Sequence, residues 1–372
     1  MRGLAAIMIK IYDRGLAAPA GPRISESNSS ENRTKHSTNP TAEGDSNPKT
    51  VEGGHPTDGR EPQELQDIDF AAERAAAERL LKLKKGIVSL GNGKTTWEMT
   101  EPLPFEPFFI SSVQMAISDV TDEEVAMLAG CRGLIELRLH NNPKLTAAGL
   151  KTLGPLPRLE SLNLAETACA RESLEFISNY PRLTSLFLAG GGSQKVLSTL
   201  PPCPRLTILE TPWADGTVGD QGLQTIARNC PQLTQLTLLD GSDYSLAPLA
   251  QLQKLRQLHC SGKQLNDAAI AALAALPDFD SLGIEVPDRA VMQRLGKLDQ
   301  KLRELSMRNQ LGLSPELLAD AADWQVITRC TQLERLTILS LIAVDATALA
   351  GRGRAAATQS VLCLRRPLAG GA

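Results

Sequence analysis

The chain has 372 residues and a formal net charge of −3, a length that suits one large domain with a tail or two domains. A charge this close to zero indicates neither the basic surface of a nucleic-acid-binding protein nor a strongly acidic field. Aromatic residues make up only 3% of the chain, which leaves few side chains for base-stacking platforms or aromatic cages.

Residues 1–66 are predicted to form a disordered N-terminal segment and linker. The apolar run Gly3–Ile9 is much shorter than the roughly 20 residues that a membrane helix needs, so we expect no membrane insertion. Gly21–Gln66 is rich in Ser, Asn, Thr, Pro and Gly. Such a segment cannot bury enough apolar surface to offset the entropy lost on ordering.

Residues 67–109 are predicted to form an N-terminal cap made of a helix and a β-hairpin. Asp67–Lys85 is rich in Ala, Glu, Leu and Lys, with acids early and lysines in the last turn, as the helix dipole favours. Two short β-like segments follow, Ile87–Leu90 and Thr95–Met99, joined by the turn residues Gly91–Lys94. The segment that follows is made of repeats. A stack of repeats exposes apolar surface at its ends, so we expect a cap here.

One pattern then recurs ten times: an apolar residue, two variable residues, an apolar residue, one variable residue and an apolar residue. The first residues of the copies are Ile110, Leu134, Leu159, Leu183, Leu206, Leu233, Leu255, Phe279, Leu302 and Leu333. The spacings run from 22 to 31 residues. The alternation at the end of each copy predicts a strand that is buried on one face.

The other half of each repeat carries a helix signal. In seven of the nine intervals, apolar residues stand nine, six and three residues before the next strand, as Leu150, Leu153 and Leu156 do. Steps of three keep these residues on one helical face, which predicts a short helix packed on the strand. Proline, which ends a helix, stands two residues before five of the strands, at Pro157, Pro181, Pro204, Pro231 and Pro277.

The strand motif and period resemble those of leucine-rich repeat proteins. Four cysteines, each three residues before a strand leucine, resemble the cysteine-containing and ribonuclease-inhibitor-like branches; they are Cys131, Cys203, Cys230 and Cys330. The resemblance covers about residues 105–350 and implies an α/β fold. It further implies a right-handed solenoid, or horseshoe, with a parallel sheet on the concave face and short helices on the convex face.

The resemblance assigns residues 110–350 to the repeats and leaves 351–372 as an irregular C-terminal tail. That tail could be a poor cap, a disordered end or the product of an altered reading frame. Ala77–Met99 is also similar to the segment before the repeats in some bacterial leucine-rich repeat proteins. In some of those the repeats follow a protein kinase domain, and this chain has no kinase motif.

No catalytic, cofactor or metal site is predicted. Leu90–Trp97 resembles a phosphate-binding loop only superficially, because Val88 stands where that motif needs glycine. The cysteines take positions that other repeats fill with leucine and form no C-x-x-C pair, which favours buried thiols in a reducing, cytoplasmic compartment. His140 and His259 lie five repeats apart and could not share a metal.

The variable strand residues are expected to point away from the core and to form the binding surface. Most are small or polar, whereas Phe187, Ile208, Glu210 and the nearby Trp213 break the pattern on neighbouring repeats, with His259 two strands further on. Exposed aromatic residues beside a charge are typical of interface hot spots, although Phe187 and Trp213 could instead cover the loop Gly190–Gly192. The predicted partner contacts are Arg138, His140, Phe187, Glu210, Trp213 and His259.

The resemblance implies a non-catalytic module that binds a protein partner by the concave face. The sequence identifies neither the partner nor the oligomeric state, and no nucleic-acid partner is expected. One alternative is the regulatory region of a kinase-like signalling enzyme that lacks its catalytic domain, since linkers such as Gly21–Gln66 usually join two parts. The other is the substrate-recognition subunit of a ubiquitin ligase, although no F-box precedes the repeats.

Overall fold

The computed structural model describes residues 65–190, 194–211, 218–238, 244–285, 288–309, 327, 329–340 and 360–363. The chain divides into two compact units, Met1–Gly54 and His55–Ala372, and the first lies outside the described residues. Most of the predicted segment 1–66, most of the predicted tail 351–372 and the predicted contact Trp213 also lie outside them. The predicted domain boundaries therefore remain predictions.

The unit His55–Ala372 is built on one sheet of 13 strands. From β3 onward each strand lies beside the next one in the chain, and all of these pairs are parallel. The strands are β1 (Ile87–Gly91), β2 (Thr96–Glu98), β3 (Phe109–Gln114), β4 (Glu136–Arg138), β5 (Ser161–Asn163), β6 (Ser185–Phe187), β7 (Ile208–Glu210), β8 (Gln235–Leu238), β9 (Gln257–Ser261), β10 (Ser281–Glu285), β11 (Glu304–Asn309), β12 (Arg335–Ser340) and β13 (Ser360–Cys363).

The register of this sheet matches the repeat motif. The second apolar residue of every copy pairs with its counterpart in the neighbouring strand. All ten are buried: Val113, Leu137, Leu162, Leu186, Leu209, Leu236, Leu258, Leu282, Leu305 and Leu336. The alternation in the sequence therefore predicted both the strands and the face that packs on the core.

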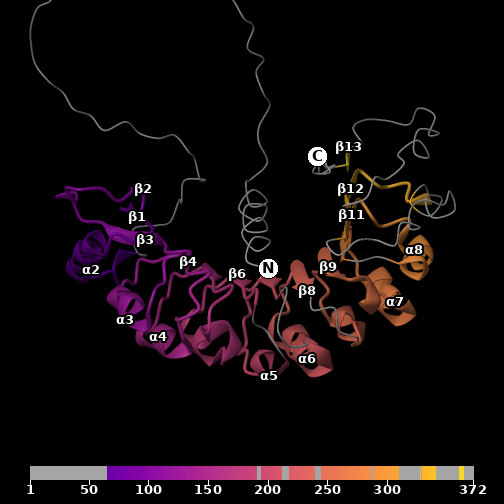
Figure 1. Cartoon of the computed structure of the whole chain (residues 1–372), viewed down its shortest axis with the longest axis horizontal. Coiled ribbons are helices and arrows are strands. Elements are labelled where there is room, and N and C mark those ends of the chain that lie inside the picture. The colour runs from indigo at the N-terminus through magenta and orange to yellow at the C-terminus, as the bar shows by residue number, and fades with distance from the viewer. Residues whose placement is uncertain are drawn as a thin grey trace, which may run out of the picture. The chain divides into compact units, whose positions relative to one another are not determined.

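Helices connect the strands, and Figure 1 shows α3 to α8 along the outer side of the curved row of strands. The α-helices are α2 (Phe70–Leu83), α3 (Asp122–Val125), α4 (Ala147–Thr152), α5 (Gln194–Leu197), α6 (Gly219–Asn229), α7 (Asp267–Ala275) and α8 (Arg289–Leu295). The 3-10 helices are η2 (Ala126–Leu128), η3 (Cys169–Arg171), η4 (Glu175–Asn179), η5 (Ala247–Gln251), η6 (Gly262–Gln264) and η7 (Gly296–Leu298).

Six of the seven apolar triplets are buried where the sequence predicted them, and the seventh includes Trp324, which lies outside the described residues. Some of the triplets belong to 3-10 helices. Leu246, Leu249 and Leu252 accompany η5, and all three are fully buried. A 3-10 helix has about three residues per turn, so a step of three fits it at least as well as an α-helix. The spacing alone therefore predicted a helical turn but did not distinguish its type.

The interval before β11 has no triplet at the predicted spacing, and the structure shows why. Its buried residues are Met292, Leu295 and Leu298, one position earlier than in other repeats. The backbone N–H groups of Lys301 and Leu302 both donate to the Leu298 carbonyl, at 3.0 and 3.1 Å, closing a longer turn before the strand. One extra residue in this turn explains the shift.

The first part of the unit contains the helix and the hairpin that the sequence predicts. Asp69 caps α2 by accepting the N–H groups of Ala71 and Ala72 at 3.0 and 3.1 Å. β1 pairs antiparallel with both β2 and β3, so the hairpin continues the repeat sheet. Ala76 and Leu80 of α2 pack into the same core as the repeats.

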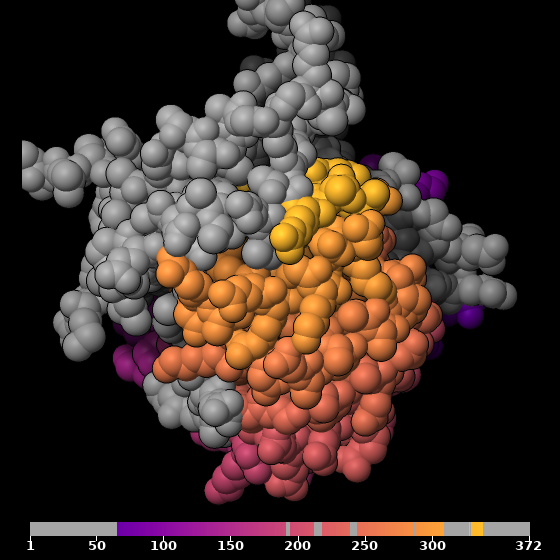
Figure 2. All heavy atoms as spheres, turned by 90° about the vertical axis from the view of Figure 1, so that its right-hand side faces the viewer, coloured from indigo at the N-terminus to yellow at the C-terminus, as the bar shows by residue number. Residues whose placement is uncertain are grey.

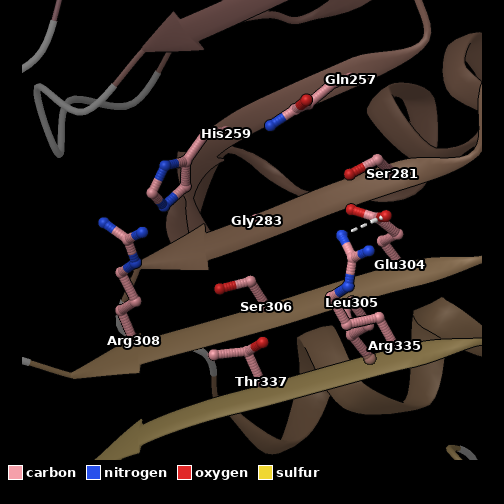
Figure 3. A pocket seen from close by; sticks show the side chains of 10 residues that line it. All are labelled: Gln257, His259, Ser281, Gly283, Glu304, Leu305, Ser306, Arg308, Arg335 and Thr337. Atoms are coloured by element: carbon pink, nitrogen blue, oxygen red, sulfur yellow. Dashed lines mark hydrogen bonds and ion pairs between the residues drawn. The ribbon is translucent and has the colours of Figure 1, made fainter. Parts of the chain in front are cut away.

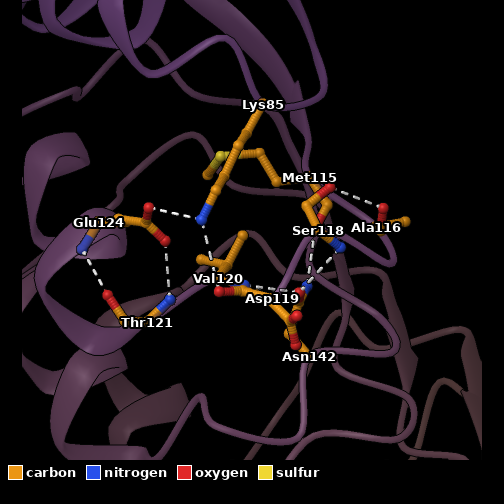
Figure 4. A network of polar contacts seen from close by, with 9 residues as sticks. All are labelled: Lys85, Met115, Ala116, Ser118, Asp119, Val120, Thr121, Glu124 and Asn142. Carbon is orange, nitrogen blue, oxygen red and sulfur yellow. Dashed lines mark hydrogen bonds and ion pairs between the residues drawn. The ribbon is translucent and has the colours of Figure 1, made fainter.

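A polar network joins this first part to the first helix of the repeats (Figure 4). Lys85 Nζ lies 2.6 Å from Glu124 Oε1, while Glu124 and Thr121 form a capping box at the start of α3. The Asn142 side chain accepts the N–H of Val120 at 2.9 Å and donates to the Met115 carbonyl at 2.7 Å. Hydrogen bonds as well as apolar packing therefore hold these segments together.

Six cysteines of the described ranges are free thiols and all are buried. They are Cys131, Cys169, Cys203, Cys230, Cys260 and Cys330. Figure 2 shows the later repeats, in salmon to orange, facing the viewer as a closely packed surface. Within the described part of the chain no helix is both long and apolar enough to cross a membrane.

Candidate functional site

Two rows of variable side chains run along the sheet on the face opposite the buried leucines; together we call them the variable face. The first row is Ser112, Glu136, Ser161, Ser185, Ile208, Gln235, Gln257, Ser281, Glu304 and Arg335, and each member keeps solvent contact. The second row is Gln114, Arg138, Asn163, Phe187, Glu210, Thr237, His259, Gly283, Ser306 and Thr337.

At the first repeats, the predicted contact Arg138 is already paired. Its Nε donates to Glu136 Oε1 at 2.7 Å, and Ser112 Oγ donates to the other Glu136 oxygen at 3.1 Å. His140 is only 8% exposed, and its carbonyl accepts the N–H of Ile117 at 3.1 Å. The Arg138 charge is therefore partly neutralised and His140 is buried, so neither is a charged protrusion.

Phe187 was expected to be an exposed aromatic residue, and this expectation is wrong. The residue is only 9% exposed. Asn163 and Glu210 flank it in register on the neighbouring strands, at a spacing of about 4.8 Å. Since Trp213 lies outside the described residues, a contact centre formed by Phe187 and Trp213 remains a prediction.

Glu210 lies beside Phe187 at the end of β7. Burial raises the pKa of its carboxyl to about 7, while the positive charge of Arg308 acts in the opposite direction. A carboxyl with this pKa carries its proton about half the time near neutral pH. Arg308 comes from β11, so its side chain influences a residue that is four strands away in the sheet order.

Strands β9 to β12 carry a small pocket of about 100 Å³ on the variable face. Figure 3 shows His259 and Arg308 on one side of this pocket, and Ser306 and Thr337 near its middle. On the other side, Arg335 Nη1 donates to Glu304 Oε1 at 2.5 Å. Both charges of that pair are therefore neutralised.

Gly283 makes room for the imidazole of His259. A Cβ atom at Gly283 would lie 2.6 Å from His259 Cδ2 and 2.8 Å from Cγ, closer than real contacts allow. In the second row Gly283 stands between His259 and Ser306 in register. The missing side chain therefore creates the hollow and lets the His259 ring lie over the strand.

The imidazole is uncharged at neutral pH. Burial lowers the pKa of His259 to about 3, and the nearby Arg308 charge acts in the same direction. Glu285 Oε2 lies 4.0 Å from His259 Nε2, beyond hydrogen-bond distance. The site thus holds a neutral imidazole and a guanidinium, with the Glu285 carboxyl close to the imidazole.

The structure brings together only some of the predicted contact residues. His259 and Glu210 both lie within the electrostatic reach of Arg308. Arg138 is on β4, five strands from His259 on β9, or about 24 Å at sheet spacing. A single small ligand could not contact Arg138 and His259 together, whereas an extended protein surface could.

Sequence reasoning missed Gly283 and Arg308 as members of the site. Arg308 lies just beyond the six-residue motif, because β11 continues to Asn309. A signal was present for Gly283, since a glycine in a row of side chains leaves a gap. No group of three or more His, Cys, Asp or Glu residues within the described ranges could hold a metal ion.

No protein-family model matches the chain, and no curated protein matches it. Among solved structures it is similar to internalin C2 from Listeria monocytogenes, with 21% sequence identity and a TM-score of 0.39. The match covers 53% of this chain and 80% of that one. The leucine-rich-repeat-like architecture described above rests on this chain's own motif and parallel register.

Proposed function

We propose that this chain is a non-catalytic module that binds a protein partner through the variable face. In this proposal the repeats form a right-handed horseshoe, with the parallel sheet on the concave face and the short helices on the convex face. The observation that carries the proposal is the unbroken register from β3 to β12. This register places ten variable residues side by side in each row.

Parallel sheets are usually covered on both faces by helices. Here the first row contains small and polar side chains that all keep contact with solvent, such as Ser161, Ser185 and Gln235. A sheet face that is polar, half-exposed and continuous over ten strands suits contact with another macromolecule. The near-neutral net charge of −3 favours a protein over a nucleic acid as that partner.

The six free, buried thiols support a reducing, cytoplasmic compartment. We therefore infer that the partner is a cytoplasmic protein. Cell fractionation with an antibody to the full chain tests this compartment, and recovery only from the medium or the periplasm would contradict it.

Affinity purification with mass spectrometry, with the full chain as bait, tests the proposal directly. Gln235→Arg places a large cation in the middle of the first row, where Gln235 is exposed on β8. Gln224→Arg makes the same change at an exposed position of α6, away from the variable face. Circular dichroism verifies that both variants are folded.

We expect Gln235→Arg to lose partners that the wild type and Gln224→Arg retain. If Gln235→Arg retained every partner, or if Gln224→Arg lost the same ones, the variable face would not be the binding surface. Absence of any reproducible protein partner in the wild-type capture would contradict the proposed function itself.

A further inference from the structure

We propose that the pocket between β9 and β12 receives the carboxylate of an Asp or Glu side chain from the protein partner. This inference rests on the proposed function, because it names the chemistry of one contact on the variable face. Two observations carry it: the space above Gly283 and the charge of Arg308 at its edge.

The space fits a small polar group. The pocket volume of about 100 Å³ is roughly three times the volume that one water molecule occupies in the liquid, about 30 Å³. Gly283 contributes no side chain to the row, while Ser306 and Thr337 contribute only short ones with hydroxyl groups. A carboxylate fits such a space and could accept hydrogen bonds from both hydroxyls.

The residues that line the pocket carry one excess positive charge. Glu304 and Arg335 neutralise each other at 2.5 Å. Arg308 forms no ion pair with another residue of the described ranges, and its Nε atom has no hydrogen-bond partner there. A partly buried guanidinium is stabilised by a carboxylate, which it can bind with two parallel hydrogen bonds.

His259 lines the pocket beside Arg308. The residue is 9% exposed, and its buried Nε2 has no hydrogen-bond partner in the part of the chain that the structure describes. Figure 3 shows the imidazole and the Arg308 guanidinium on the same side of Gly283. Because the imidazole lines the pocket, its signal reports any ligand that enters there.

The alternative ligand is a cationic side chain. Two carboxyls, Glu285 and Glu210, lie near this group but are not part of the pocket lining. A lysine or arginine entering the pocket would meet the Arg308 charge directly.

Nuclear magnetic resonance of the full chain, labelled with ¹³C and ¹⁵N at histidine, tests the inference. The chain has only 4 histidines, and His259→Asn identifies the His259 signal. The probes are the N-acetyl N-methylamides of glutamate, glutamine and lysine, which differ mainly in charge. We expect the glutamate derivative to shift the His259 signal saturably and the other two derivatives to leave it unchanged.

Two variants of Arg308 separate charge from structure. We expect Arg308→Gln to raise the half-saturating concentration by about tenfold or more, equivalent to about 1.4 kcal/mol, and Arg308→Lys to retain part of the binding. Arg303→Gln is the matched control, since Arg303 is exposed and pairs with Glu334 at 3.0 Å. This control should bind as the wild type does.

An equal shift from the glutamine or lysine derivative, no shift from the glutamate derivative, or unchanged binding in Arg308→Gln would overturn the inference. The capture experiment distinguishes this failure from failure of the proposed function. If Gln235→Arg lost the partner while the pocket failed the titration, the variable face would remain the binding surface without a carboxylate pocket.

Discussion

The Glu73 carboxylate accepts a hydrogen bond from the backbone N–H of Gly133 at 2.9 Å, across 60 residues of chain. Its other oxygen accepts the N–H of Ile110, also at 2.9 Å. Ile110 lies in β3 and Gly133 just before β4, so one side chain of α2 contacts the start of two successive repeats. Burial raises the pKa of Glu73, and these two N–H groups act against that shift.

This arrangement makes α2 part of the repeat structure. A Cβ atom at Gly133 would lie 2.5 Å from the Phe109 Cβ, so glycine is needed for the close packing there. The helix therefore ends the stack with specific hydrogen bonds as well as with apolar residues.

Replacing Glu73 with alanine should strongly destabilise the fold. Two backbone N–H groups would lose their acceptor in a buried place, at a cost of about 1–3 kcal/mol each. We expect the free energy of unfolding to fall by about 2–6 kcal/mol, measured by guanidinium denaturation of the full chain.

Glu78→Ala is the matched control, because Glu78 belongs to the same helix but is exposed. Its effect should stay within about 0.5 kcal/mol. Similar losses for Glu73→Ala and Glu78→Ala would show that the two N–H contacts do not stabilise the junction.

The sequence predicted the repeat core well because its signals are local. Alternation with period two identified the buried faces of β3 to β12, and steps of three identified most of the helical turns. The one-residue shift to Met292 arises from turn geometry, which no periodicity encodes. Local pattern therefore predicted the architecture and left the turn details open.

The candidate site was less predictable because it depends on contacts between strands. Phe187 looked exposed from its position in the motif, yet it is 9% exposed in the folded chain. The pocket requires Gly283, His259 and Arg308 from three strands, and Arg308 lies outside the repeated motif. Only the register and the side-chain directions bring these residues together.

Glu210 should make stability depend on pH. Its folded pKa of about 7 lies above the ordinary value of 4.5, so its contribution is fully present below about pH 4.5. That contribution is lost as pH rises through about 7, because the unfolded chain ionises first. We expect the wild type to lose at most about 3 kcal/mol relative to Glu210→Gln between pH 5 and 8.

Chemical denaturation of both proteins at pH 5, 6, 7 and 8 measures this difference. A constant difference between the wild type and Glu210→Gln would show that Glu210 titrates alike in the folded and unfolded chains.

Gly283→Ala should displace the His259 ring. The new methyl carbon would lie 2.6 Å from His259 Cδ2, so the imidazole or the strand must move. We expect a loss of about 1–3 kcal/mol in stability together with a changed chemical shift of His259.

Gly222→Ala in α6 is the control. The nearest contact of its new methyl carbon would be an ordinary 3.4 Å, so this variant should be neutral or stabilising by up to about 1 kcal/mol. An unshifted His259 signal in a stable Gly283→Ala protein would argue against the close approach.

Cys203 should be the first of the six buried thiols to react with iodoacetamide in the native protein. A hydrogen bond from Cys230 lowers the pKa of Cys203, and the residue is 6% exposed. Burial raises the pKa of Cys169 to about 12, and it also raises the pKa of Cys260, which is fully buried. Since the thiolate is the reactive form, a short alkylation pulse followed by peptide mapping should modify Cys203 several-fold faster than the others.

Cys230→Ala removes the hydrogen-bond donor and should slow the alkylation of Cys203, whereas Cys230→Ser keeps a donor and should preserve the rate. Both variants replace a buried thiol with a small side chain, so a general loosening of the repeat would accelerate Cys203 in each of them. Only Cys230→Ala lacks the donor, so a difference in the Cys203 rate between the two variants measures the effect of the hydrogen bond. Equal rates for Cys203 in the alanine and serine variants would therefore assign its reactivity to exposure alone.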